Sequence, residues 1–227
     1  GTLKLKTKAD SKPDYNGIVV TEDILLVTEW NECNLQLYSR HDGRLLSSHE
    51  LESRPTGVCL ISKTEVAVCL WDRRIVILSF KSIDNVKLLK TLDVRTGFYE
   101  CHSVAKLNSD KLVVSGMNYD HMMYCWGVVS ITDGRLDSTR NICKVDLGST
   151  HLAIKDNTVY ISCMTLVSTT TGVYAYDIFN PHTHKFLHQH KELNRPGTIM
   201  VDGDLVFVCD LDSNRIHQLT DSGQLVT

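Results

Sequence analysis

The sequence predicts an all-β fold, a β-propeller of four-stranded antiparallel blades, and three observations predict it. A short segment of apolar and β-branched residues recurs five times along the 227 residues, at intervals of 41 to 47 residues. Each copy lies between a preceding short apolar strand and a following strand, with turn residues at the junctions. No long window has the 3.6-residue periodicity of a helix. Four strands per repeat of about 40–50 residues are typical of a propeller blade.

The recurring segment is expected to be the second strand of each blade. The copies align on Val27, Val68, Val114, Ile161 and Val208. The next position holds only small residues, namely Thr28, Cys69, Ser115, Ser162 and Cys209. A period of two with β-branched residues favours strands over helices. We therefore expect the small residues to lie where strands converge on a shared axis.

The remaining strands follow from the turns. First strands are expected at 17–20, 57–60, 103–105, 151–154 and 197–201, and third strands at 34–38, 74–78, 125–130, 172–176 and 215–219. Polar turns such as Asp202-Gly203 and Asp42-Gly43 connect neighbouring strands, and a fourth strand such as 44–47 or 87–90 completes the unit. The sequence thus predicts a single domain with blades at about 14–52, 53–94, 95–142, 143–193 and 194–227.

The segment from Pro196 to Gly223 resembles an NHL repeat, and the first repeat, from Gly17 to Gly43, is similar but more degenerate. The whole set is similar to the C-terminal propellers of invertebrate tripartite-motif (RING/B-box/coiled-coil) proteins. The resemblance implies a six-bladed ring that recognises targets, either for a ubiquitin ligase or as an RNA-binding regulator. The zinc ligands of RING and B-box domains are not in this sequence, so we expect no ligase activity from this chain alone.

Only five blades are visible, which leaves two ways to close the ring. Residues 2–7 include Leu3-Lys4-Leu5-Lys6 and alternate like an edge strand, yet the fifth blade has its own fourth strand at 224–226. Either a sixth blade is missing beyond residue 227, the alternative we favour, or residues 2–7 replace that tail in a five-bladed ring. A true truncation would leave an exposed sheet edge.

Composition limits the partners. The net charge of -3 gives no global attraction for a polyanion. No apolar run approaches the roughly 20 residues that span a bilayer, and the first residues have no signal-peptide character. We expect a cytoplasmic protein without membrane contact. The 8 cysteines form no C-x-x-C pair. Because Cys59, Cys69, Cys163 and Cys209 lie in apolar runs, reduced structural thiols are expected, with at least one disulfide as the alternative.

The candidate binding surface is the face that carries the second-to-third-strand loops and the linkers between blades. These segments are rich in arginine and aromatic residues, which anchor protein interfaces and also stack on unpaired bases. The candidate residues are Trp30, Arg54, Trp71, Arg73, Arg74, Tyr99, Tyr119, Arg195 and Arg215. Neighbouring carboxylates should dilute any positive field there, namely Glu29, Asp72, Glu100, Asp120 and Asp210.

The same residues also have a purely structural interpretation. Trp30 and Trp71 can simply pack between blades, and Arg73, Arg74 and Arg195 can be ordinary solvated surface residues. The first functional hypothesis is nevertheless a binding platform for a protein target. Single-stranded RNA is the alternative ligand on the same face. Any oligomerisation is expected to come from domains outside this chain.

Catalysis has little support in the sequence. There is no G-x-S-x-G elbow, and the adjacent Cys101 and His102 should point to opposite faces of a strand. Four alternating histidines resemble a zinc site but fit an outer surface strand better, namely His182, His184, His188 and His190. We therefore expect no enzyme, metal or cofactor. The weakest hypothesis is a metal-dependent hydrolase or lyase using His102 and His151 in the channel.

Overall fold

The structure, a computed structural model, describes residues 5, 13–82, 85–94, 98–118, 122–144, 149–164, 171–180, 184–188, 193 and 195–226. In these residues the chain forms twenty strands in five four-stranded antiparallel sheets, without a helix. Each sheet contains four consecutive strands in sequence order. The prediction of a β-propeller built from four-stranded blades is therefore confirmed.

The five blades follow the chain in order. Blade 1 contains β1 (Tyr15–Val20), β2 (Ile24–Glu29), β3 (Asn34–Ser39) and β4 (Leu45–Glu50). Blade 2 contains β5 (Pro55–Ser62), β6 (Glu65–Leu70), β7 (Arg74–Ser82) and β8 (Asn85–Asp93). Blade 3 contains β9 (Glu100–Lys106), β10 (Lys111–Asn118), β11 (Met123–Ser130) and β12 (Leu136–Lys144). Blade 4 contains β13 (Ser149–Lys155), β14 (Thr158–Met164), β15 (Gly172–Asp177) and β16 (His184–His188). Blade 5 contains β17 (Pro196–Asp202), β18 (Leu205–Asp210), β19 (Arg215–Thr220) and β20 (Leu225–Val226).

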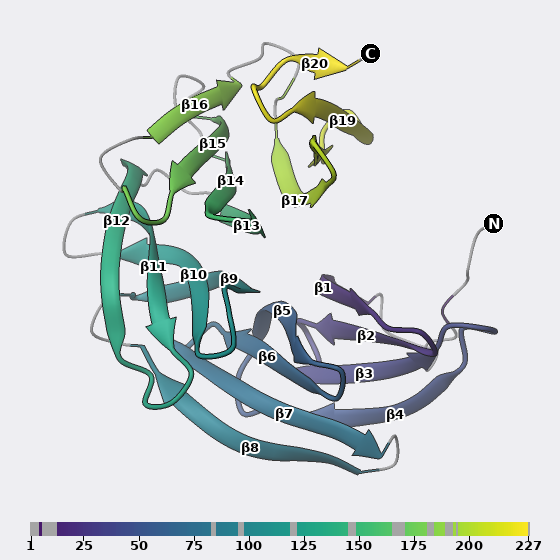
Figure 1. The fold of residues 1–227 in the computed structure, drawn as a ribbon. Helices are drawn as coiled ribbons and strands as arrows, with labels where there is room; N and C mark the ends of the chain where they lie inside the picture. The colour runs from purple at the N-terminus through teal and green to yellow at the C-terminus, as the bar shows by residue number, and fades with distance from the viewer. Residues whose placement is uncertain are drawn as a thin grey trace.

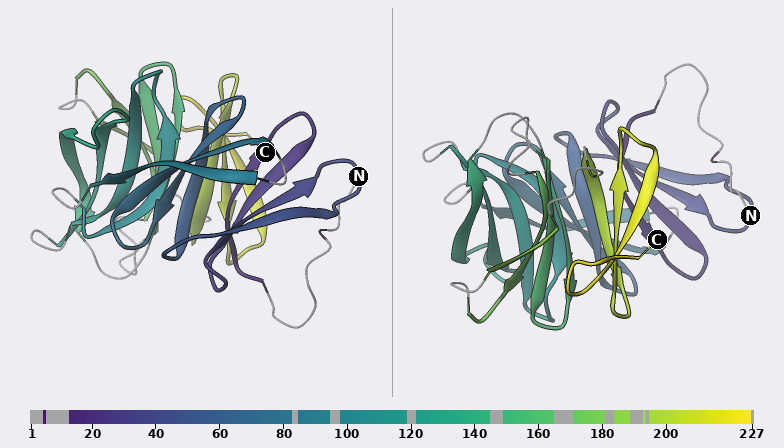
Figure 2. Two further views of the ribbon diagram at one scale, coloured as in Figure 1. Left: turned by 90° about the horizontal axis from the view of Figure 1, so that it is seen from below. Right: turned by 90° about the horizontal axis from the view of Figure 1, so that it is seen from above.

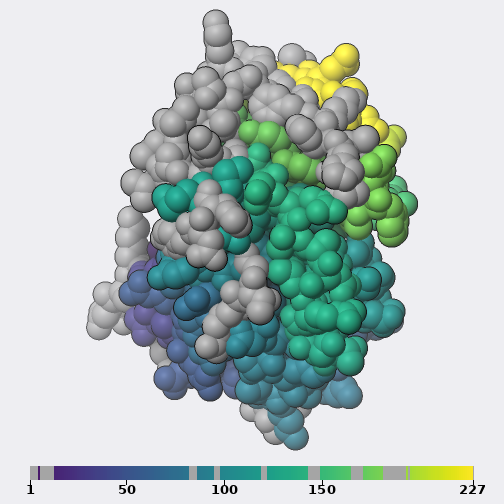
Figure 3. Space-filling view, turned by 90° about the vertical axis from the view of Figure 1, so that its left-hand side faces the viewer, coloured from purple at the N-terminus to yellow at the C-terminus, as the bar shows by residue number. Residues whose placement is uncertain are grey.

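The blades stand side by side around a common axis and form an arc (Figure 1). The first strand of each blade lies innermost, and β1, β5, β9, β13 and β17 contact one another in that order. Figure 2 shows the arc from below and from above, with the blades stacked face against face. On the outer side of the arc the blades succeed one another in chain order (Figure 3). All loops between strands therefore open on one of two faces.

Apolar cores fill the spaces between neighbouring blades. One cluster joins blades 1 and 2, and three more join blades 2 and 3, 3 and 4, and 4 and 5. The five residues on which the repeats align are all at most 2% exposed. Each pairs with an apolar residue of the first strand, as Val68 does with Val58 and Ile161 with Leu152. Full burial of such side chains stabilises the fold by about 1.5–3 kcal/mol each. The residues that recur in the sequence repeat are therefore the residues that form the cores between blades.

The small residues next to the alignment position lie where neighbouring blades approach most closely. The Ser115 hydroxyl donates to the carbonyl of Thr150 in blade 4, 3.4 Å away, and the Ser162 hydroxyl donates to the carbonyl of Gly197 in blade 5. A Cβ atom at Gly57 would lie 3.0 Å from the Ser103 Cα of blade 3. The small residues thus lie where the backbones of neighbouring blades come close together, as expected for strands that converge on one axis.

The described residues do not close into a ring of five blades. No apolar cluster among them joins blade 5 to blade 1, and Figure 1 shows the two blades at the ends of the arc. β20 is the fourth strand of blade 5, as expected from residues 224–226. Of residues 2–7 only Leu5 is described, and it packs on blade 1 against the cluster of Leu25, Val27 and Tyr38. The six-bladed ring stays a prediction.

Both end blades present apolar side chains toward the open part of the arc. Ile18 and Val20 pair with Val27 and Leu25, and so share the sheet face that turns away from blade 2. On blade 5, Met200 and Ile216 lie on the face opposite the core shared with blade 4. These four side chains are 57%, 51%, 55% and 69% exposed, in the order named. On both end blades this face therefore carries apolar side chains that no other described blade covers.

The cysteines behave mainly as core residues. The seven whose side chains are described are free thiols, and Cys69 and Cys163 are buried as expected, whereas Cys59 and Cys209 are only partly buried. Burial raises the pKa of the Cys59 and Cys125 thiols to about 12. These thiols therefore stay protonated and poorly reactive at neutral pH. Within the described part of the chain no helix is long and apolar enough to cross a membrane.

Candidate binding surface at the channel mouth

Two cavities lie along the propeller axis and share part of their walls. The first, which we call the channel cavity, has a volume of about 350 Å³. The second, which we call the mouth, has a volume of about 330 Å³ and opens on the loop face, the face with the second-to-third-strand loops and the blade linkers. Tyr15, Thr56, His151 and Thr198 line both. The two cavities are thus parts of one passage between the inner strands.

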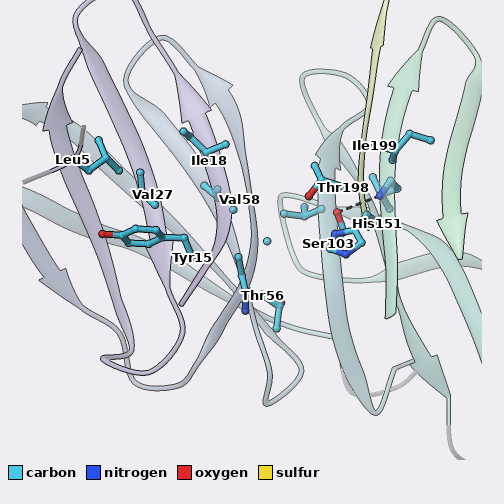
Figure 4. A pocket seen from close by; sticks show the side chains of 15 residues that line it. Leu5, Tyr15, Ile18, Val27, Thr56, Val58, Ser103, His151, Thr198 and Ile199 are labelled. Atoms are coloured by element: carbon cyan, nitrogen blue, oxygen red, sulfur yellow. Dashed lines mark hydrogen bonds between the residues drawn. The ribbon is translucent and has the colours of Figure 1, made fainter. Parts of the chain in front are cut away.

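The walls of the channel cavity are mainly aliphatic. Ile18, Val27 and Val58 line it from blades 1 and 2, and Ser103 and His151 lie on the other side (Figure 4). The Ser103 hydroxyl accepts a hydrogen bond from the backbone amide of Leu152 at 3.3 Å, which joins blades 3 and 4. Burial and the neighbouring His102 lower the pKa of His151 to about 4. His151 is therefore neutral at physiological pH.

One backbone position of the repeat brings large apolar side chains to the mouth. The residue that follows the second strand donates its amide to the carbonyl of the residue that immediately precedes the first strand. This bond joins Trp71 to Arg54 at 2.8 Å and Leu211 to Arg195 at 3.0 Å, and it joins Trp30 to Asp14 in blade 1 at 2.8 Å. Because the backbone is held in the same way in these blades, the three side chains reach the same cavity.

Two buried carboxylates fix the loops around the mouth. Glu29 is 1% exposed and accepts the backbone amides of Asp14, Asn31 and Glu32. Asp210 is also 1% exposed and occupies the equivalent position in blade 5. Both were expected to dilute a positive field on the loop face. Their charges instead satisfy loop amides below the surface, because a buried carboxylate requires donors.

Asp210 has the same kind of partners as Glu29. It accepts the backbone amides of Arg195 at 3.1 Å and Asp212 at 3.2 Å, and the hydroxyl of Ser213 at 2.9 Å. The His217 Nε2 atom lies 3.7 Å from its second oxygen. These bonds hold the loop that presents Leu211 in one conformation. The mouth is therefore preorganised at its blade 1 and blade 5 sides.

A row of aromatic rings crosses the mouth from blade 1 to blade 3. The Trp30 and Trp71 rings meet edge to face with centroids 5.2 Å apart, and Trp71 stacks on His102 at 6.1 Å with an interplanar angle of 24°. His102 in turn contacts Tyr124 at 5.9 Å. Trp71 is 39% exposed, whereas His102 is buried beneath it. The tryptophans thus pack between blades and also present indole surface to solvent.

The arginines of the loop face fall into two groups. The guanidinium of Arg54 lies over the Trp30 ring, 5.3 Å from its centroid, and that of Arg73 lies over the Tyr99 ring at 4.9 Å. Arg74 instead forms ion pairs with Asp72 and Glu52, which raise its pKa. Because those carboxylates already occupy it, Arg74 is a weaker candidate for binding a partner.

The remaining candidates are Arg195, Arg215 and Tyr119, and of these only Arg195 is seen at the mouth. Arg195 lines the mouth, and its Nη1 atom is 3.7 Å from an Asp212 oxygen. Arg215 is exposed at the start of β19 and does not line the mouth. Tyr119 lies outside the described residues. The structure thus brings together Trp30, Arg54, Trp71 and Arg195, and it places Arg73 with Tyr99 beside them.

His102 is the polar group at the base of the mouth. The Thr150 amide donates to its Nδ1 atom at 3.3 Å, so the ring proton lies on Nε2, which faces a Glu100 oxygen at 3.5 Å. This arrangement orients the ring under Trp71. No group of three or more metal-ligating side chains occurs among the residues whose positions are known. Of the four alternating histidines, His184 and His188 are the first and last residues of the outer strand β16. The side chains of all four histidines lie outside the described part of the structure.

Sequence reasoning missed two apolar residues of the mouth, Met164 and Leu211. Both occupy the second position after the small-residue column, which also holds Trp30, Trp71 and Met117. This second column of large apolar residues was visible in the sequence. It could have identified most of the mouth, since Trp30, Trp71, Met164 and Leu211 line it, whereas Met117 of blade 3 is buried in the core shared with blade 4.

Comparison with known proteins gives the fold alone. No family profile matches the sequence, and no curated protein matches it. Among solved structures, the chain is similar to hydrazine synthase of Kuenenia stuttgartiensis, with a TM-score of 0.72 and 12% identity over 91% of this chain. It is also similar to a chain of a nidogen/laminin complex, with a TM-score of 0.71 and 13% identity over 94% of this chain. The WD40 propeller domain of Doa1 matches with a TM-score of 0.66 and 10% identity over 88% of this chain.

These similar structures are longer than the chain described here. The chain spans 64% of the hydrazine synthase chain, 78% of the chain from the nidogen/laminin complex and 62% of the Doa1 chain. At such low identities the likeness carries no information about chemistry. What the comparisons establish is a β-propeller.

Proposed function

We propose that this chain is a protein-binding platform that recruits its target through the mouth and the surrounding loop face. The observation that carries the proposal is the row of Trp30, Trp71 and His102, which leaves indole surface exposed above a preorganised cavity. Tryptophan and arginine are among the residue types enriched in interface hot spots, and here they lie next to each other. One of the similar solved structures is itself a chain in a protein complex, nidogen/laminin.

The more specific role follows from the resemblance of residues 196–223 to an NHL repeat. On that basis we propose that the propeller is the substrate-recognition end of a tripartite-motif ubiquitin ligase. The support is the sequence resemblance together with the blade architecture. A reading frame that encodes RING, B-box and coiled-coil segments ahead of Gly1 would be the direct test of this parent protein.

Single-stranded RNA remains the second candidate ligand for the same face. The observation that favours it is Tyr99, which is 49% exposed with Arg73 over its ring, since bases stack on such groups. RNA binding predicts an affinity that falls steeply with salt. Anisotropy with a random single-stranded RNA pool at low and high salt distinguishes it from protein binding.

Photo-cross-linking tests the proposed function. Benzoylphenylalanine replaces Tyr99 or Leu211 on the loop face, and Phe179 provides the matched control, since it is 76% exposed in a third-to-fourth-strand turn on the opposite face. We expect a specific cross-linked partner from the two loop-face positions and none from position 179. A partner that cross-links only at position 179 would show that the opposite face binds.

A further inference from the structure

We propose that the partner is an acidic peptide segment that places one large apolar side chain in the mouth and carboxylates on Arg54 and Arg73. This inference rests on the proposed function and specifies the chemistry of the partner. It is carried by the way the two guanidinium groups are held and by the apolar cavity between them.

Arg54 and Arg73 are held by aromatic rings and not by carboxylates. Each guanidinium lies over an aromatic ring, Arg54 over Trp30 and Arg73 over Tyr99. Within the described part of the chain, neither group forms an ion pair or donates a hydrogen bond. A cation–π contact of this kind uses none of the N–H donors of the guanidinium, which remain for a ligand. A group that is already oriented loses less entropy when it binds a carboxylate.

Two other arginines of the loop face already have acidic partners from the chain itself. Arg74 is paired with Asp72 and Glu52, and Arg195 lies 3.7 Å from Asp212. Arg215 is exposed on the same face but does not line the mouth. Near the mouth, the described arginines without an acidic partner are therefore the two that lie over aromatic rings, which defines where a carboxylate of the ligand binds.

The mouth can hold one apolar side chain of the partner as an anchor. The mouth has a volume of about 330 Å³, at the lower end of the range of about 300–1,000 Å³ typical of ligand pockets. Trp71 and Leu211 line it with 39% and 52% of their surfaces exposed, and Met164 adds a flexible apolar wall. A single leucine or aromatic side chain fits a cavity of this size and covers these exposed groups.

The positions of the two arginines on blade 2 define the path of the peptide segment. Arg54 immediately precedes β5, the innermost strand of blade 2, whereas Arg73 immediately precedes β7, its third strand. Trp71 lies between them in the same loop region and lines the mouth. A peptide that crosses blade 2 from Arg54 to Arg73 therefore passes over Trp71, where its anchoring side chain enters the mouth. Carboxylates on either side of the anchoring side chain match this order.

The charges around the mouth favour a peptide over a nucleic acid. Exposed carboxylates lie on the same face at Glu32, Glu52 and Asp212. A continuous phosphodiester backbone would approach these groups and be repelled. A peptide can instead place its few carboxylates only where the two stacked arginines are. The net charge of -3 agrees with this choice.

Selection from a random library of displayed 12-residue peptides tests the inference. The targets are the wild-type chain, the double variant R54A/R73A, and R44A as the matched control, because Arg44 lies in a turn on the opposite face beside Asp42. We expect enriched peptides with at least two acidic residues around one large apolar residue. The R44A variant should select the same peptides as the wild type, whereas the R54A/R73A variant should not select them.

Affinity measurements on the selected peptide sharpen the test. By fluorescence anisotropy, each of R54A and R73A should weaken binding about tenfold, a typical cost of losing an interface arginine. R54K should weaken it less than R54A, since lysine keeps the charge but loses the planar stacking. Replacement of the central apolar residue of the peptide by alanine should also weaken binding.

Three results would overturn the inference. They are the absence of any enriched peptide, enrichment of neutral or basic peptides, and acidic peptides whose affinity does not change in R54A/R73A. Arginine-dependent retention of a random RNA pool without peptide binding would assign the arginines to phosphates instead. If the partner still cross-links at positions 99 and 211 in any of these cases, the proposed function stands and only the acidic chemistry is wrong.

Discussion

The indole rings of Trp30 and Trp71 meet edge to face across the boundary between two blades, with centroids 5.2 Å apart. They are the same position of two successive repeats, held by the same backbone hydrogen bond. The pair shows how the repeat produces the site. Residues about 41 positions apart in the chain become direct neighbours because blades 1 and 2 both present this position at the mouth.

A double-mutant cycle on this pair should reveal a stabilising coupling. We expect Trp30→Ala and Trp71→Ala to be non-additive by about 0.5–1.5 kcal/mol, the usual range for aromatic pairs beyond their buried area. Urea denaturation of the wild type, both single variants and the double variant measures it. Strict additivity would mean that the two rings contribute only through separate contacts.

Removal of the Glu29 carboxylate should destabilise the blade 1 loop and the whole fold. Glu29→Ala leaves loop amides without their acceptor, and the expected cost is about 1–3 kcal/mol. Glu32→Ala is the matched control, since Glu32 is exposed two positions beyond Trp30. Chemical denaturation of both variants compares them, and equal stabilities would contradict the assigned role of Glu29.

Two glycine substitutions should differ sharply in cost. A Cβ atom at Gly116 would lie 2.0 Å from the Glu100 carbonyl oxygen, so Gly116→Ala forces neighbouring strands apart and should cost more than about 2 kcal/mol. Gly203 has a φ of 55° and no atom near its Cβ position, so Gly203→Ala should cost about 1 kcal/mol. Thermal unfolding of both variants would reveal the order, and a reversed order would show that β9 and β10 are less closely paired.

Acid should destabilise the protein partly through His151. Burial and His102 lower its pKa to about 4, below the unfolded value of about 6.5. Between these two values the unfolded state binds more protons than the folded state. The stability that the neutral ring contributes is therefore complete above pH 6.5 and is lost as the pH falls toward 4, by about 1–3 kcal/mol.

The comparison of His151→Asn with the wild type isolates this effect. We expect the variant to lose less stability than the wild type between pH 7 and pH 4.5, measured by urea denaturation at each pH. His41→Asn is the control, because His41 is 75% exposed at its side chain. A wild-type pH dependence in His151→Asn would mean that other groups cause the acid sensitivity.

The blades could be predicted because their determinants are local. Val27, Val68 and their equivalents combine a fixed interval with a period of two, and turn residues mark each hairpin. The short strand β20 followed from the same pattern. Local patterns of this kind identify strands without any knowledge of how the blades pack.

The site could be predicted only in part, because its chemistry depends on contacts between blades. The sequence identified Arg54, Arg73 and Arg74 alike, yet only Arg74 is neutralised, by Glu52 and Asp72. It also placed Glu29 among surface charges, whereas the fold buries it under loop amides. Which cation has a partner is decided by loop conformation, and the sequence does not encode that in any short pattern.

We propose above all that the mouth is the surface that binds the partner. Titration calorimetry of the cross-linked partner, once purified, against the wild type, Trp71→Ala and Phe179→Ala tests it most directly, with circular dichroism to show that all three are folded. We predict that Trp71→Ala weakens binding at least about tenfold and that Phe179→Ala leaves it unchanged. Equal affinities for the wild type and Trp71→Ala would contradict the claim.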